Sequence, residues 1–277
     1  YVSFNDGEKW ESFQINLPIV PITDLAIREN DLIVATQGRA FWILDNLSFL
    51  HQLKSSTVND NFHVYQSPKT FLNNGNRNEK PSNEGMNPYP GLVINYWIKH
   101  IHDTSKVVIK IYDKNNILLR TFKNTVSDKK ETIKVENGMN QFVWDMNVKG
   151  VEKIDDMILW NGNIDDYNVA PGNYKAVVFY DADSVIMPFS ILKNPNYNIS
   201  ENEYQASFEF LNSIKSKFEE TQQTIKYIRI TRQQINALKD KLGNKYPKEL
   251  DSLGKKINQQ LTSIEDKLYQ TKAKSNQ

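Results

Sequence analysis

Short apolar runs separated by polar turn clusters dominate the first fifth of the chain. Tyr1–Phe4 and Trp10–Phe13 flank an Asn-Asp-Gly turn, and Gly7 suits the positive φ that such a turn requires. Three further runs follow, with a polar cluster at 28–31 and a turn at Gly38 between them: Ile22–Ile27, Leu32–Thr36 and Ala40–Leu44. Strands of this length with turn signals between them are typical of all-β structure. Residues 1–53 are therefore predicted to form one four-stranded sheet unit.

This unit has an apolar face and no similar unit elsewhere in the sequence. Sheet units of this kind are normally found in rings, because one unit alone leaves its apolar face in water. We therefore expect residues 1–53 to be the last blade of a β-propeller whose other blades lie upstream of Tyr1. A catalytic or ligand-binding centre of such a propeller would lie mostly upstream as well.

The middle of the chain reads as a linker followed by a second β domain. Residues 54–90 are mostly polar, with one apolar island at Phe62–Leu72 that predicts a single strand interrupted by Pro68. Residues 91–194 hold alternating strands, and in 107–111 the odd positions form one apolar face. An immunoglobulin-like β-sandwich is expected, with strands at Leu92–Ile98, Lys106–Tyr112, Ile117–Phe122, Gln141–Met146, Tyr174–Tyr180 and Val185–Leu192.

Residues 200–274 change to helical periodicity. Ser200-Glu-Asn-Glu203 is a capping-box pattern, and apolar residues then recur in steps of three and four as far as Leu242. Gly243-Asn244 predicts the end of this helix, and Pro247 suits the start of the next. The pattern predicts an antiparallel helical hairpin whose first helix has roughly 40 residues, or about 60 Å. The fold class expected for the whole chain is mainly β with an α-helical C-terminus.

The second helix is only half as long as the first, so it leaves part of the first helix without cover. The apolar residues of that proximal part then need another surface, which is either the sandwich or a partner protein. The candidate docking residues are Tyr204, Phe208, Leu211 and Phe218.

Composition narrows the classes of function. Thirty-four basic residues balance 33 acidic ones, so the overall charge gives no argument for nucleic acid or anionic membrane as a partner. The chain has no cysteine, which excludes disulfides, zinc–thiolate sites and cysteine nucleophiles. It has no run of 18 apolar residues, so no transmembrane segment is expected. No phosphate-binding glycine loop, serine elbow or HExxH motif occurs, and no cofactor is expected.

Several segments resemble a known family. Ser3–Trp10 is similar to the Asp-box, Ser-x-Asp-x-Gly-x-Thr-Trp, with Asn5 in place of the Asp and Lys9 in place of the Thr. Residues 25–45 resemble the last blade of bacterial sortilin-like, Asp-box (BNR) repeat propeller proteins, which are commonly labelled glycosyl hydrolases. Further similarities lie in Asn87–Gly91, Gly138–Asp145 and Ala170–Tyr174, and in a helical pattern like Ile228–Gln234.

The resemblance implies an exported bacterial protein, located in the periplasm, at the cell surface or outside the cell. It implies a structural role for the Asp-box, formed by Ser3, Asn5, Gly7 and Trp10, and for the turn of Gly38 and Arg39 with Asp45. The glycosidase label follows the propeller fold, and a fold does not determine a function.

Candidate chemistry inside the chain is sparse. Neighbouring residues on a strand point to opposite faces, so the acid pairs at 155–156 and 165–166 do not make a glycosidase dyad by themselves. Asn161-x-Asn163-x-Asp165 has the oxygen spacing of a calcium loop without its closing glutamate, and a polar loop is the favoured alternative. His100-x-His102 is either a metal pair or a pair of surface histidines, and we favour the second.

One arginine and three tryptophans each allow a functional and a structural interpretation. Arg39 either faces the rim of a propeller or, as we favour, holds the blade by bonding a carbonyl or Asp45. The tryptophans at 42, 144 and 160 either stack on sugars or, as we favour, belong to the core.

The expected function is therefore that of a non-catalytic support and protein-interaction region. Its partners would be the upstream propeller of the same protein and a further protein that binds the helical hairpin. The alternative is an accessory region of a glycosidase-like propeller hydrolase whose active site lies upstream of residue 1.

Overall fold

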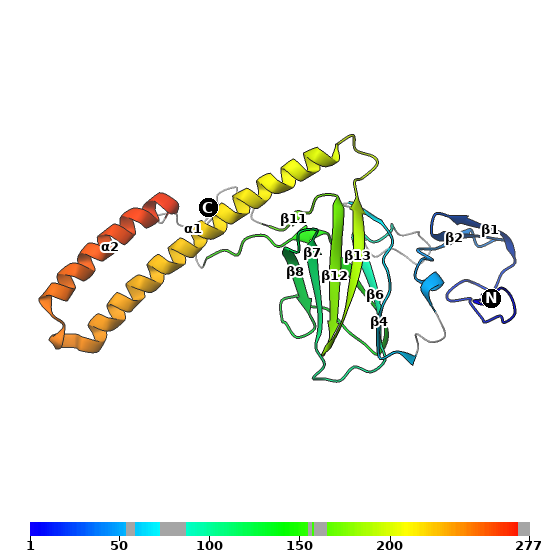
Figure 1. Ribbon diagram of the computed structural model, residues 1–277, viewed down its shortest axis with the longest axis horizontal. Coiled ribbons are helices and arrows are strands. Elements are labelled where there is room, and N and C mark those ends of the chain that lie inside the picture. The colour runs from blue at the N-terminus through cyan, green and yellow to red at the C-terminus, as the bar shows by residue number, and fades with distance from the viewer. Residues whose placement is uncertain (54–58, 73–86, 155–156, 158–164, 271–277) are drawn as a thin grey trace. The chain divides into compact units, whose positions relative to one another are not determined.

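A computed structural model describes residues 1–53, 59–72, 87–154, 157 and 165–270. The described chain is mostly β, with a pair of α-helices at its C-terminal end, which confirms the fold class at this level (Figure 1). It divides into two compact units. The first comprises Tyr1–Asn147 and Ala170–Glu201, and the second comprises Val148–Val169 and Asn202–Gln277.

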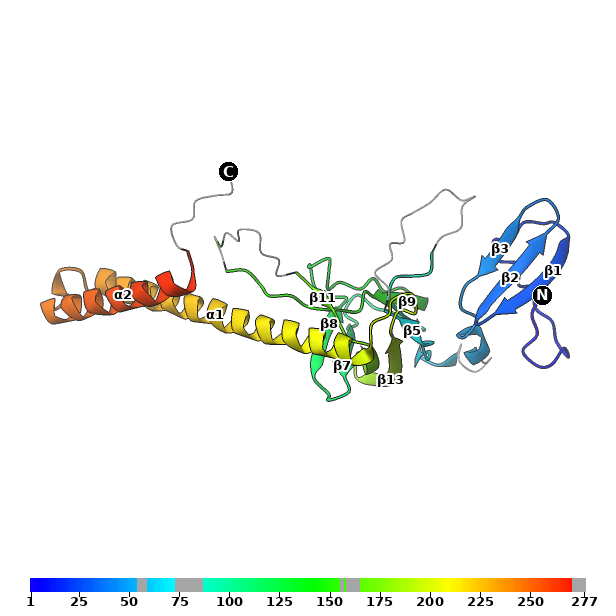
Figure 2. The same ribbon diagram turned by 90° about the horizontal axis from the view of Figure 1, so that it is seen from above.

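The N-terminal part of the first unit contains a three-stranded antiparallel sheet (Figure 2). Its strands, in the order β1-β2-β3, are β1 (Ile22–Arg28), β2 (Asp31–Thr36) and β3 (Phe41–Leu44). The expected four-stranded unit is thus wrong by one strand, because residues 1–13 contribute only an isolated bridge between Val2 and Glu11. Pro18 and Pro21 lie between that bridge and β1, and proline has no N–H group to extend a ladder.

Two larger sheets form the rest of the first unit. One has the order β5-β13-β12-β7-β8, and the other has the order β4-β6-β9. The strands are β4 (Phe62–Val64), β5 (Thr70–Phe71), β6 (Leu92–Ile98), β7 (Val107–Asp113), β8 (Leu118–Lys123), β9 (Gly138–Trp144), β12 (Gly172–Tyr180) and β13 (Asp183–Leu192). A short 3-10 helix, Leu50–Gln52, precedes them.

The apolar island at Phe62–Leu72 is two strands rather than the one that was expected. β4 pairs antiparallel with β6, whereas β5 pairs parallel with β13 in the other sheet. Pro68 lies between the two strands, and a residue without an N–H donor suits a crossing from one ladder to another.

The core of the first unit lies between these two sheets. β6 and β7 alternate buried and half-buried positions, as the apolar spacing of 107–111 predicts. Trp144 of β9 is fully buried, and its ring packs edge-on against Tyr174 of β12 and Phe189 of β13, at centroid distances of 6.4 and 6.1 Å. The Tyr174 and Phe189 rings stack at 5.8 Å. This aromatic cluster joins the two sheets.

Two buried tyrosines of this core have opposite hydrogen-bonding environments. The Tyr174 hydroxyl donates to the Ala170 carbonyl at 2.6 Å, and burial raises the pKa of Tyr174 well above its usual value. The Tyr96 hydroxyl is buried and has no hydrogen-bond partner among the residues described. Burial raises the pKa of Tyr96 to about 12.

Replacement of each tyrosine by phenylalanine should therefore affect stability differently. Tyr174→Phe removes a satisfied buried hydrogen bond, and we expect a loss of about 1 kcal/mol in the free energy of unfolding. Tyr96→Phe removes a buried hydroxyl without a partner, so we expect no loss or a gain of up to about 1 kcal/mol. Urea unfolding followed by tryptophan fluorescence measures both, and equal losses in the two variants would contradict the assignment.

The second unit is built around two helices, α1 (Glu201–Leu242) and α2 (Lys248–Leu268). A 3-10 turn at Gly243–Lys245 joins them, and Gly243 has a φ of +48°, as the expected helix end requires. The helices run antiparallel, since Lys239 is paired with Asp251 near the turn and Arg232 is paired with Glu265 further away. Within the described ranges, neither helix is long and apolar enough to cross a membrane.

The described residues of the segment Val148–Val169 contact the first helix. They include Val148 of β10 (Asn147–Val148) and the whole of β11 (Tyr167–Asn168), which pairs with β10 in a two-stranded sheet. The Ile154 amide donates to the Gln222 side chain at 3.2 Å, and the Tyr167 hydroxyl donates to Asn212 at 2.6 Å. Burial, and secondarily the charge of Glu219, raises the pKa of Tyr167 to about 12.

Candidate interaction surfaces

The Asp-box-like hairpin is held by side-chain hydrogen bonds rather than by a strand ladder. Ser3 Oγ accepts from the Gly7 amide at 2.8 Å and donates to Asn5 Oδ1 at 3.0 Å. Asn5 Oδ1 also accepts from the Lys9 amide at 2.9 Å. An amide oxygen therefore makes the bonds that an aspartate oxygen can make here, and the structural role expected for Ser3, Asn5 and Gly7 has a direct geometric basis.

The other motif residues lie near this hairpin or at the turn between β2 and β3. Gly7 has a φ of +92°, and the nearby Trp10 ring is exposed. Gly38 has a φ of +86°. Arg39 donates its amide to Thr36 Oγ1 and accepts at its carbonyl from Trp42 Nε1 at 3.0 Å. Its backbone thus closes the turn, whereas a bond from its guanidinium to Asp45, which follows β3, stays a prediction.

The β1–β3 sheet is apolar on both faces. The strand register places Leu25, Val34 and Trp42 side by side on one face. It places Ala26, Ile33 and Ile43 on the other face. Sheets that read as apolar on both faces are usually covered on both sides.

Large side chains of this sheet are nevertheless exposed on each face. Leu25 is 61% exposed and Phe41 is 76% exposed, and they belong to opposite faces. Ile27 and Ile43 repeat this pattern with exposed side chains. Contiguous exposed apolar area of this kind marks interaction surfaces. The sheet is therefore the strongest candidate interaction surface of the first unit.

The four candidate docking residues of α1 differ in their surroundings. Phe208 is half-buried, and its ring lies 6.1 Å from that of Tyr167 within the second unit. Tyr204 and Phe218 are also half-buried, and Leu211 is exposed. Phe210 and Ile214 are also exposed, at 65% and 48%, and neither is among the predicted docking residues.

A heptad pattern explains which part of α1 is covered. Residues at two positions of a seven-residue repeat form one seam along the helix: Leu211, Ile214, Phe218, Thr221, Ile225, Ile228, Arg232, Ile235, Lys239 and Leu242. Ile225 and Ile228 are buried, whereas Leu211 and Ile214 are exposed. The seam is therefore occupied in its distal half and open in its proximal half, as the unequal helix lengths predict.

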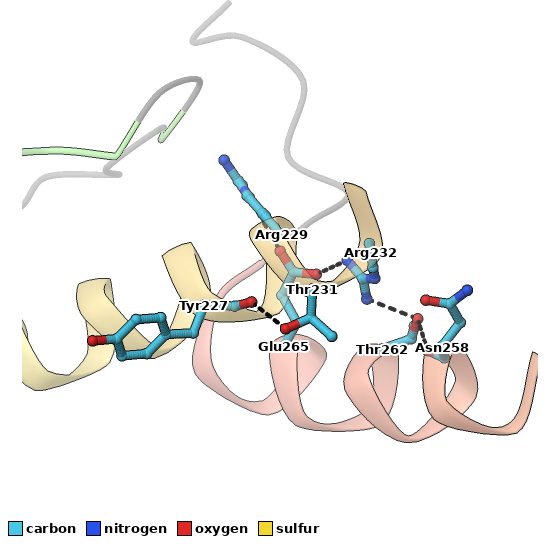
Figure 3. A network of polar contacts seen from close by, with 7 residues as sticks. All are labelled: Tyr227, Arg229, Thr231, Arg232, Asn258, Thr262 and Glu265. Carbon is cyan, nitrogen blue, oxygen red and sulfur yellow. Dashed lines mark hydrogen bonds and ion pairs between the residues drawn. The ribbon is translucent and has the colours of Figure 1, made fainter. Parts of the chain in front are cut away.

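A buried carboxylate joins the two helices in the distal half (Figure 3). Glu265 of α2 is only 4% exposed and accepts from Arg232, and its other oxygen lies 3.4 Å from Arg229 Nε. Arg232 also donates to Thr262 Oγ1 at 2.9 Å. Because both carboxylate oxygens are paired, burial of the charge is compensated.

A second charged cluster lies nearer the turn. Asp251 of α2 is 2.7 Å from Lys239 Nζ and 2.8 Å from Lys255 Nζ. Hydrogen bonds from these two lysines lower the pKa of Asp251 to about 2. The carboxylate is therefore ionised at neutral pH and adds a polar contact between the helices.

A shallow groove of about 320 Å³ lies between residues 149–152 and α1. Lysines and glutamates both line it, including Lys149, Glu152, Lys215, Glu219 and Lys226. Lys149 Nζ lies 3.0 Å from Glu152 Oε1, and Lys215 Nζ lies 3.7 Å from Glu219 Oε1. This mixed and internally paired lining does not select one sign of ligand charge.

The acidic and histidine candidates do not form a metal centre in the described ranges. Asp155, Asp156 and the 161–163 part of the calcium-like loop lie outside the described residues. Asp166 Oδ1 accepts from the Gly150 amide at 2.9 Å, which is a structural role. His100 offers its carbonyl to Tyr180. The described residues hold no group of three His, Cys, Asp or Glu side chains that could bind a metal ion.

The three tryptophans considered as sugar-binding candidates differ in their surroundings. Trp144 belongs to the core, as expected, and Trp42 is half-buried in the β1–β3 sheet. Trp160 lies outside the described residues. The Trp144 ring is covered and offers no platform for a sugar, whereas Trp42 Nε1 donates to the Arg39 carbonyl.

The fold and its surfaces define a β-rich protein with a C-terminal helix pair and exposed apolar surfaces on a sheet and a helix. In comparisons with models of known protein families and with curated proteins, nothing matches this chain.

Proposed function

We propose that this chain is a non-catalytic support and protein-interaction region at the C-terminal end of an exported, sortilin-like propeller protein. In this proposal β1–β3 belongs to the last blade and packs against a neighbouring blade from upstream sequence. The two larger sheets form an immunoglobulin-like domain that supports the blade, and the helical hairpin docks a further protein.

The observation that carries the proposal is the exposure of apolar side chains on both faces of β1–β3. A blade within a propeller contacts a neighbour on each face, so both faces need apolar residues. Leu25 and Ile27 supply one face, and Phe41 and Ile43 supply the other. The Asp-box-like hydrogen bonds around Ser3 and Asn5 support the same interpretation.

The strand order supports the immunoglobulin-like part of the proposal. The last two strands, β12 and β13, pair with each other, β12 also pairs with β7, and β4-β6-β9 make the opposing sheet. The bond from Tyr174 at the start of β12 back to the Ala170 carbonyl matches the tyrosine corner of that fold.

Support for the helical part comes from the open proximal half of the α1 seam. Leu211 and Ile214 continue the line of residues that α2 covers further along, so a partner helix could extend the same packing. Phe210 adds a large exposed ring beside them.

A matched pair of isoleucines tests the blade assignment. Ile43 in β3 is 60% exposed and Ile117, in the turn before β8, is 58% exposed. In this chain alone, Ile43→Asp and Ile117→Asp should each change the free energy of unfolding by less than about 0.5 kcal/mol. In the longer protein that includes upstream blades, Ile43→Asp should cost about 2–4 kcal/mol, because the new carboxylate is buried between sheets. Thermal or urea unfolding measures both.

Hydrogen exchange and activity assays complete the test. We expect amides of β1–β3 to exchange at least about tenfold faster in this chain alone than in the longer protein. Equal exchange in the two forms, or an Ile43→Asp effect no larger than that of Ile117→Asp, would overturn the blade assignment. Glycan and peptide hydrolysis assays of both forms test the proposal that this chain is not catalytic. Activity of residues 1–277 alone would overturn that proposal.

A further inference from the structure

Helix α2 faces α1 with small and polar residues. Asp251 pairs with Lys239, Thr262 and Glu265 bond Arg232, and a Cβ added to Gly254 would lie 3.3 Å from Ile235. The side-chain oxygen of Asn258 is buried as well. These five α2 residues are spaced 3-4-4-3 and therefore form one continuous line along the helix.

The large apolar residues of α2 form a different line. They are spaced 3-4-4-3-4: Leu250, Leu253, Ile257, Leu261, Ile264 and Leu268. We call these residues the apolar line. Most of them lie one residue before a member of the line that faces α1, so the apolar line is rotated by about 100° from that side of the helix. Leu253 is 52% exposed, Ile264 is 46% exposed, and Leu250 and Leu268 are also exposed. The interface with α1 therefore leaves the most apolar side of α2 uncovered.

Charges beside the apolar line indicate the kind of partner. α2 carries four lysines and four acidic residues, so it has no excess of positive charge that would favour an anionic membrane. Glu249 and Lys267 lie 18 residues apart, which is about five turns, so they share one flank at opposite ends of the line. Both side chains are exposed.

We propose that the apolar line of α2 is the docking surface for a second copy of this chain. The two α2 helices pair antiparallel, so the same flank of each helix faces the partner and each Glu249 meets the partner's Lys267, whereas a parallel pair would leave Glu249 and the partner's Lys267 at opposite ends. The apolar spacing is nearly the same when it is read in either direction, so the line is complementary to itself, as a two-fold interface requires.

The rotation between the two lines also determines the shape of the dimer. A rotation of about 100° is close to a right angle, so two stacked hairpins produce a square four-helix bundle. Contact along one pair of 21-residue helices buries roughly 1,000 Å² in total, which is at the low end of specific interfaces. We therefore expect a dimer that dissociates at micromolar concentrations. This inference does not depend on the propeller assignment.

Sedimentation of the 277-residue chain between about 1 and 100 μM tests the proposal. Leu253→Glu and Ile264→Glu should each make the chain monomeric over this range. Gln259→Glu is the matched control, because it adds the same charge to an exposed position on the far side of α2 from the apolar line. The far-ultraviolet circular dichroism of each variant reports whether its helices are intact. A chain that is monomeric at 100 μM, or a dimer that Leu253→Glu leaves unchanged with its helices intact, overturns the proposal.

Charge reversal tests the antiparallel arrangement without altering the apolar line. Glu249→Lys and Lys267→Glu should each weaken the dimer by about tenfold, since each affects two ion pairs, and the double variant should restore the original affinity. A dimer whose affinity is unchanged by both single reversals overturns the antiparallel arrangement.

Binding to vesicles with anionic lipid tests the membrane alternative. A chain that is monomeric and binds such vesicles, with binding that Leu253→Glu abolishes, overturns self-association.

Discussion

Gly91→Ala should cost at least about 3 kcal/mol in the free energy of unfolding of the sandwich. A Cβ built on Gly91 lies 2.2 Å from the Trp144 carbonyl oxygen and 3.0 Å from its carbon. These are backbone atoms of β9, which pairs with β6 from Leu92 onward, so they cannot move without disturbing the ladder. The adjacent Trp144 ring is the centre of the aromatic cluster, and the damage should therefore reach the core.

Gly138→Ala is the control for this prediction, because it introduces the same methyl group in the same sheet. Gly138 has a φ of +95°, and its added Cβ would meet only the Trp97 ring at 3.6 Å, an ordinary contact. Backbone strain alone should cost about 1–2 kcal/mol. Urea unfolding followed by tryptophan fluorescence compares the two. A Gly91→Ala loss no larger than that of Gly138→Ala would show that the close approach to Trp144 is not rigid.

Combined replacement of Arg229 and Arg232 by alanine should destabilise the helix pair by about 3–5 kcal/mol. The Glu265 carboxylate, which is only 4% exposed, would stay buried while the two arginines that pair with it are removed. Unfolding followed by circular dichroism at 222 nm measures the loss. The size of the effect comes from the desolvated charge rather than from the contact area that the alanines remove.

Two further variants separate this effect from general damage to the helices. Addition of Glu265→Leu to the double alanine variant should recover most of the loss, because an apolar side chain then fills the site without a buried charge. Lys217→Ala breaks the exposed pair with Glu220, in which the side chains are 82% and 67% exposed, and should leave the stability of the helix pair nearly unchanged. Failure of Glu265→Leu to rescue the double variant would contradict the buried-charge explanation.

Local features of this chain were the most predictable. The bonds among Ser3, Asn5, Gly7 and Lys9 span at most four residues, so the Asp-box-like spacing is sufficient to indicate them. The helix end at Gly243 and the alternation in β7 are local for the same reason. The heptad spacing of α1 could also have identified Phe210 and Ile214 as docking candidates, because they fall beside and on the seam.

Features that depend on distant partners could not be predicted in this way. The island at Phe62–Leu72 is apolar throughout, and only its pairing with β6 and β13 divides it between two sheets. Tyr96 and Tyr174 look alike in sequence, and their hydrogen bonding differs because only Tyr174 lies within reach of an available carbonyl.

By itself the sequence determined the class of fold, the two helices and the lines of apolar residues, because periodicity is a property of neighbouring residues. Tertiary structure alone decided which of these lines are covered. The apolar spacing of α2 favours that side as the contact with α1, yet the side of α2 that carries the buried Glu265 faces the arginines of α1 instead. Burial depends on where another element sits, and a pairing of charges across two helices is not encoded in the spacing of either one.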